Sequence, residues 1–119
     1  TMGAAEAART RANATLAALF DQVDYIISAT NPDTAFPARL EVNTRVAGET
    51  VDLGNNGALT IPYNIVGNPA VTIPIEQLDG LPVGMQVATR HHAEELLLDL
   101  AATAESQCPW PLVAPGAPV

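Results

Sequence analysis

The stretch that decides the fold reads TIPYNIVGNPAVTIPIEQLDGLPVGMQVA over residues 60–88. Gly67 suits the left-handed conformation that ends a helix, so a short helix is predicted from Gly57 to Val66. Pro62 is compatible with this helix only in its first turn. Two segments with the residue pattern of β-strands follow, and Asp79-Gly80 between them is typical of a turn. The stretch therefore predicts a short helix and then a hairpin, whose strands cover 70–75 and 83–88 and are joined by a loop of several residues.

The flanking segments predict an α/β protein. Residues 3–20 are rich in alanine and predict a helix, with small residues on its apolar face that indicate close approach to a neighbour. Residues 25–29 are short and apolar without alternation, which is typical of a strand buried on both faces in a parallel or mixed sheet. Residues 92–106 predict a second long helix, whose apolar stripe consists of Leu97, Leu100, Ala101 and Ala104.

Two segments show no regular pattern. Residues 30–56 contain prolines, glycines and the pair Asn55-Asn56, and a loop of this length inside a compact domain is usually functional or mobile. Residues 107–119 form a proline-rich tail that is expected to be extended.

Composition excludes several classes of function. Five arginines and no lysine oppose thirteen acids, for a net charge of −8, which disfavours binding to nucleic acid and to anionic membranes. No apolar run approaches the roughly 20 residues that span a bilayer. A single cysteine, Cys108, and no recognisable signal peptide fit a cytoplasmic location.

The residues alone indicate no catalytic centre. His91 and Glu95 are four positions apart, but no further ligand completes a metal site, so neither a metal nor a cofactor is expected. Ser28 lies in a predicted strand and Ser106 at a helix end, and neither has the small neighbours that expose a nucleophile. Cys108 has no activating cation nearby in sequence.

Several co-spaced motifs resemble the C-terminal segment of the amidase signature family. The upstream match begins with Phe20 and Asp24 before the predicted strand, and it continues more loosely through Thr30-Asn31-Pro32. The motifs occur in the same order as in the family, and the similarity covers residues 10–106. The more specific matches are Thr60-x-Pro62-x-Asn64-x-x-Gly67-x-Pro69-Ala70-x-x-x-Pro74, Asp79-Gly80-Leu81-Pro82-x-Gly84-x-Gln86 and Glu94-Glu95-Leu96-Leu97.

This resemblance implies a three-layer α/β/α enzyme with a mixed sheet that hydrolyses carboxamide C–N bonds. Its members use a nucleophilic Ser, a second Ser across a cis peptide bond and a Lys base, and they form an acyl-enzyme. In the family these residues lie upstream of the segment matched here. No catalytic residue can therefore be assigned in this chain, which is expected to be the C-terminal part of a single amidase domain and inactive alone.

The same resemblance implies a contribution to the acyl-binding wall. The predicted substrate-binding residues are Thr30, Asn31, Pro32, Asn56 and Gly57. Glutamine-specific members, which act within tRNA amidotransferases, tend to carry an Asp at the position of Gly57. The glycine favours a general amidase that takes a small amide substrate, although Asp52 is a possible substitute for that Asp and the amidotransferase remains the alternative.

A third hypothesis is a non-catalytic interaction module. For the amidase hypotheses, the expected partners are the remainder of the parent chain or a second copy, because strands with apolar faces need cover that two helices do not supply.

Overall fold

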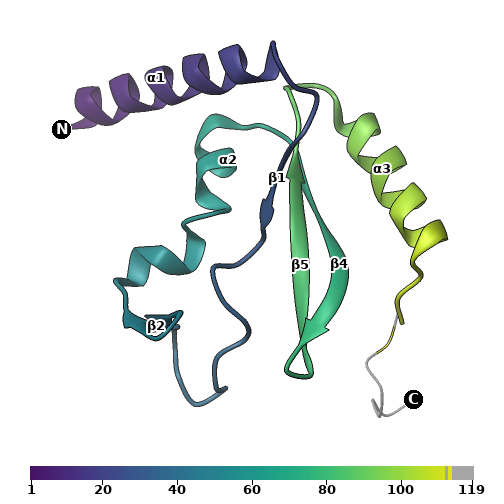
Figure 1. Cartoon of the computed structure of the whole chain (residues 1–119). Helices are drawn as coiled ribbons and strands as arrows, with labels where there is room; N and C mark the ends of the chain where they lie inside the picture. Colours follow the sequence, from purple (N-terminus) through teal and green to yellow (C-terminus); the bar gives the residue numbers. More distant parts are fainter. Residues whose placement is uncertain (112, 114–119) are drawn as a thin grey trace.

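The computed structural model describes residues 1–111 and 113 (Figure 1). Its elements follow the order α1 (Met2–Phe20), β1 (Ile26–Ala29), β2 (Arg45–Val46), β3 (Glu49–Thr50), the 3-10 helix η1 (Leu53–Gly57), α2 (Ile61–Val66), β4 (Ala70–Leu78), β5 (Leu81–Ala88) and α3 (Glu94–Gln107).

The hairpin of β4 and β5 is the centre of the fold. Its turn consists of Asp79 and Gly80, with φ of 52° and 77°. Two central residues at positive φ make a type I′ turn, whose twist matches that of the flanking strands. The predicted hairpin is confirmed, but the loop of several residues is wrong because both strands run on to the turn. A register shift between Pro74 and Glu76 marks a bulge in β4.

A third strand, β1, completes a sheet with the order β1-β5-β4. Both strand pairings are antiparallel, and Ile27 lies opposite Val87. The prediction that 25–29 is buried on both faces does not hold within this chain, where Ile27 is 61% exposed. Within the described residues β1 is an edge strand, and α3 covers the β4 side of the sheet.

The core lies between the sheet and α3. Leu97 packs with Ile73 and Val87, and it is only 3% exposed. Leu100, Ala101 and Ala104 surround this cluster, so the predicted apolar stripe is confirmed.

The opposite face of the sheet meets the segment that leads into α2. The buried side chain of Gln86 donates a hydrogen bond to the carbonyl oxygen of Leu59. Figure 1 shows α2 and α3 on opposite sides of the strands. The chain thus has helices on both faces of a sheet, which confirms the α/β class.

The predicted ends of the two long helices lie within two residues of those observed, but the short helix predicted from Gly57 begins only at Ile61, since Gly57 ends the separate helix η1. Gly67 ends α2 with φ of 82°, as its position predicts. α1 forms and contacts α2, with Phe20 buried and Ala12 and Leu16 half-buried, whereas Ala5 and Ala8 of the predicted apolar face are exposed. The hairpin of β2 and β3 was not predicted within the loop 30–56. Of the proline-rich tail 107–119, Gln107 ends α3 and Trp110 packs against the core, whereas 112 and 114–119 lie outside the described residues.

No helix in the described part of the chain combines the length and apolarity that crossing a membrane requires.

Candidate functional site

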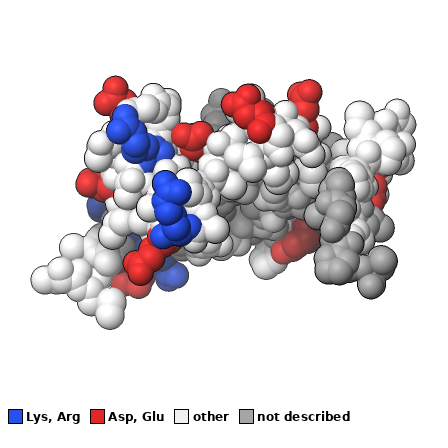
Figure 2. Space-filling model, turned by 90° about the horizontal axis from the view of Figure 1, so that it is seen from below, with Lys and Arg blue, Asp and Glu red and all other residues white. Residues whose placement is uncertain are grey.

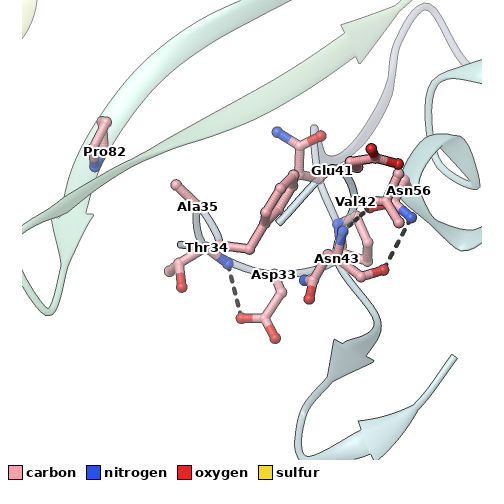
Figure 3. Close-up of a pocket in the computed structure, with 11 residues that line it drawn as sticks. Asp33, Thr34, Ala35, Glu41, Val42, Asn43, Asn56 and Pro82 are labelled. Atoms are coloured by element: carbon pink, nitrogen blue, oxygen red, sulfur yellow. Dashed lines mark hydrogen bonds between the residues drawn. The ribbon is translucent and has the colours of Figure 1, made fainter. Parts of the chain in front are cut away.

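A pocket of about 390 Å³ opens between the loop that follows β1 and the end of η1 (Figure 3). One wall comes from Asn31 to Phe36, a second from Glu41 to Asn43, and Asn56 and Pro82 complete the lining. Among the described residues that line it, the charged groups are the carboxylates of Asp33 and Glu41.

Asn56 fastens the second wall to η1. Its Oδ1 accepts a hydrogen bond from the backbone N–H of Asn43 at 2.9 Å, and its Nδ2 donates to the carbonyl of Asn43 at 3.1 Å. Nδ2 also donates to the carbonyl of Leu53 at 2.9 Å. Both amide hydrogens are therefore used, and Figure 3 shows the pair side by side.

Asp33 fastens the first wall in a similar way. Its Oδ1 accepts from the backbone N–H of Thr34 at 2.8 Å, and its Oδ2 accepts from that of Ala47 at 3.2 Å. Ala47 has φ of 50°, an uncommon conformation for a residue with a Cβ. This contact ties the β2–β3 hairpin to the loop after β1.

The structure brings three of the five predicted site residues together. Asn31, Pro32 and Asn56 line the pocket. The Thr30 hydroxyl instead donates to Thr72 Oγ1 at 3.3 Å on the sheet. Gly57 follows Asn56 at the end of η1, where an added Cβ would lie 2.7 Å from Cγ1 of Ile61.

A second pocket of about 480 Å³ adjoins the first along Asn31 to Thr34. Its other wall is largely apolar and comes from the sheet, through Ile27, Ala29, Ile75, Leu78, Val83 and Met85. These residues were not predicted as site residues, because an apolar strand residue gives the same sequence pattern whether it lines a pocket or a core.

The serine side chains are engaged in local hydrogen bonds. Ser28 Oγ donates to the carbonyl of Ala29 at 3.1 Å and accepts from Gln86 at the same distance. Ser106 Oγ donates to the carbonyl of Thr103 at 2.8 Å within α3. Neither serine has a histidine or carboxylate among its hydrogen-bond partners in the described part of the chain, so neither is activated as a nucleophile there.

The histidines do not form part of a metal cluster. The rings of His91 and His92 have centroids 6.2 Å apart. Across residues 1–111 and 113, no three side chains of His, Cys, Asp or Glu gather as metal ligands.

The surface carries mixed charge. On the face shown in Figure 2, acidic side chains are scattered, and the few arginines lie among them in one half of the view. Within residues 1–111 and 113, two of the arginines form ion pairs, Arg9 with Glu6 and Arg90 with Asp24.

Comparison with known proteins identifies the fold and its family. The family model described as Amidase matches residues 2–98. The A subunit of the glutamyl-tRNA(Gln) amidotransferase from Syntrophomonas wolfei is 37% identical over 99 residues, which are 83% of this chain and 19% of that protein. The chain thus spans about a fifth of the length of the curated relatives it matches.

Two solved structures show the same arrangement. A bacterial aryl acylamidase of the amidase signature family superposes with a TM-score of 0.73 and 25% identity, over 86% of this chain and 22% of its own. The corresponding glutamyl-tRNA(Gln) amidotransferase component from Thermotoga maritima gives 0.68 and 29%, over 86% and 21%. From the family model and these structures, the chain belongs to the amidase signature family.

Proposed function

We propose that this chain forms the C-terminal part of an amidase-signature hydrolase and one wall of its substrate pocket. The observation that carries the proposal is the family match over residues 2–98, together with the fact that the chain covers only about a fifth of the length of each relative. The pocket lined by Asn31, Pro32 and Asn56 is the part of the site that these residues supply.

The chemistry follows the acyl-enzyme route of the family. A serine attacks the carboxamide carbon while a second serine relays its proton towards a lysine. That proton passes to the amine as the C–N bond breaks, and water then hydrolyses the ester to the acid and the free serine. All three catalytic groups come from outside this chain, which contains no lysine. The single cysteine, which allows no disulfide within the chain, supports a cytoplasmic enzyme.

Exposed apolar side chains on the sheet indicate that a partner covers this surface. Ile75 and Leu78 are 58% and 57% exposed, and with Ile27 they line one wall of the second pocket. Among the described residues, β1 lies at the edge of the sheet beside this wall, and an edge strand can pair with another chain. We infer that the remainder of an amidase domain covers this surface, and that a second copy of the chain takes its place when that remainder is absent.

The alternative function is the amide-hydrolysing component of a glutamine-dependent tRNA amidotransferase. The identity of 37% to such a component favours it. Gly57 argues against it, because it supplies no carboxylate for the ammonium group of glutamine. A glutaminase assay on the complete protein separates the two functions, since a general amidase leaves glutamine intact.

Reading the gene upstream of Thr1 and expressing the complete frame tests the main proposal. The expected frame encodes a lysine and then a serine- and glycine-rich stretch, and its product hydrolyses simple aryl or alkyl amides. A complete frame without these residues would overturn the proposal and favour a non-catalytic interaction module.

A further inference from the structure

We propose that Gln86 is a positioning residue that sets the width of the substrate pocket, an inference that rests on the proposed amidase function. Gln86 does not line the pocket. It lies in β5 with its side chain on the sheet face opposite the α3 core, where it is only 4% exposed.

Gln86 joins elements that are far apart in the chain. Its Nε2 donates to the carbonyl of Leu59 at 2.8 Å and to Ser28 Oγ at 3.1 Å. Ser28 lies directly opposite Gln86 in the register of β1 and β5. Leu59 lies in the connection between η1 and α2. One hydrogen of the Gln86 amide therefore attaches this connection to the sheet, and the other joins Gln86 to the neighbouring strand β1.

This attachment extends to the pocket through η1. Leu59 is three residues beyond Asn56, which holds both backbone groups of Asn43. A shift of Leu59 away from the sheet would carry Asn56 with it, and Asn43 would follow. The second wall of the pocket is thus held at one point on β5.

The first wall is held two residues away on the same strand. The backbone N–H of Thr30 donates to the carbonyl of Gly84 at 3.0 Å, and its hydroxyl donates to Thr72. A Cβ at Gly84 would lie 2.6 Å from Thr72 Cγ2 and 3.0 Å from Thr30 Oγ1, so this approach requires glycine.

Gly84 and Gln86 face the same side of β5, since side chains alternate along a strand. Both walls of the pocket are therefore fixed relative to one rigid strand. This arrangement lets a single buried amide determine the distance between Asn31 and Asn56.

Hydrogen exchange on the 119-residue chain tests this inference without requiring any enzymatic activity. Gln86→Leu removes both donors at similar side-chain size, and the matched control is Gln77→Leu at an exposed position of β4. We expect the amides of residues 53–60 to exchange at least about tenfold faster in Gln86→Leu, while those of α3 and the β4–β5 hairpin change by less than about twofold. Gln77→Leu should leave all of these rates unchanged.

Two further measurements keep the proposal open to refutation. If Gln86→Leu does not fold, the side-chain amide of Gln86 in the unaltered chain can be compared with that of Gln77 by NMR. We expect at least about tenfold slower exchange at Gln86, because its hydrogens are bonded and buried. Ser28→Ala, which leaves the bond to Leu59 in place, should keep residues 53–60 within about twofold of the unaltered chain. Equal rates at the two glutamines, or an unprotected 53–60 segment in Ser28→Ala, would overturn the assignment.

Kinetics of the complete enzyme then separate positioning from general stability. Gln86→Leu should raise KM about tenfold, which corresponds to roughly one hydrogen bond, and leave kcat within about threefold. A fall in kcat at constant KM would contradict the proposed role. A complete protein without amide turnover would instead refute the proposed function, and the exchange result would stand on its own.

Discussion

The side-chain amide of Asn56 pairs with both backbone groups of Asn43, thirteen residues earlier in the chain. The amide accepts from the N–H and donates to the carbonyl, as a neighbouring strand would. This pairing orders a loop that lacks a hydrophobic core of its own, and it places Asn56 and Asn43 together in the wall of the pocket.

Asn56→Ala should therefore loosen the pocket and destabilise the chain by about 1–3 kcal/mol, because two backbone groups of Asn43 and the Leu53 carbonyl lose their partner. Urea unfolding measures the change in the free energy of unfolding. The control is Asn64→Ala on the exposed side of α2, and this substitution should change the free energy of unfolding by no more than about 0.5 kcal/mol. An equal effect of both substitutions would refute the role of the pairing.

Leu97→Ala should be more costly, at about 2–5 kcal/mol, since this side chain is almost fully buried between Ile73 and Val87. Glu94→Ala, one turn earlier and exposed, should change stability by no more than about 0.5 kcal/mol. Thermal and urea melts of the two variants check the difference, and a Leu97→Ala variant as stable as the unaltered chain would contradict the observed packing of α3.

The ionisation of Tyr63 should lower the free energy of unfolding of the chain at alkaline pH. Burial raises the pKa of its hydroxyl above the ordinary value of 10.0, because the ionised form is poorly solvated. Its contribution to stability is present below about pH 10 and is lost as the pH rises through the pKa of the folded state.

Tyr63→Phe cannot ionise, so its free energy of unfolding should rise relative to that of the unaltered chain above about pH 10. Urea titrations between about pH 8 and pH 11 measure this difference, and the value at the lower pH serves as the reference. A difference that stays constant over this range would refute the prediction.

The 119-residue chain should hydrolyse no amide or ester by itself. It has no lysine, and the hydroxyls of Ser28 and Ser106 donate hydrogen bonds to backbone carbonyls. Incubation with a panel of aryl and alkyl amides should give the rate of buffer alone. Turnover that disappears in Ser28→Ala or Ser106→Ala would show that the chain carries its own nucleophile.

The chain alone should also self-associate, because Ile27, Ile75 and Leu78 form an exposed apolar wall beside the free edge of β1. Light scattering at several concentrations should give masses above the 12.4 kDa of one chain. Ile27→Lys, which places a charge on that edge, should lower the mass, whereas Met2→Lys at the exposed start of α1 should not. A concentration-independent monomer with a cooperative melt would favour the interaction-module hypothesis.

Local signals in the sequence determined the long helices, the end of α2 and the central hairpin. Alanine-rich and leucine-striped segments have the period of a helix, Gly67 supplies a positive φ, and Asp79-Gly80 fits a type I′ turn. The motifs around Asn64 and Gly84 also sufficed for the family. Each of these features depends on residues that are close together in the chain, so its physical cause can be read directly from the sequence.

Features that depend on contacts between distant parts of the chain were decided only by the tertiary structure. The apolar composition of β1 does not reveal that the strand lies at an edge with Ile27 exposed, because burial depends on which elements cover it. The position of the β2–β3 hairpin beside the loop after β1 involves Asp33, which accepts a hydrogen bond from Ala47 fourteen residues away. The predicted site residues are divided in the same way: Asn31, Pro32 and Asn56 meet in a pocket, whereas Thr30 bonds to Thr72 on the sheet. Contacts of this kind join segments that are distant in the chain, and they leave no periodic pattern in the sequence.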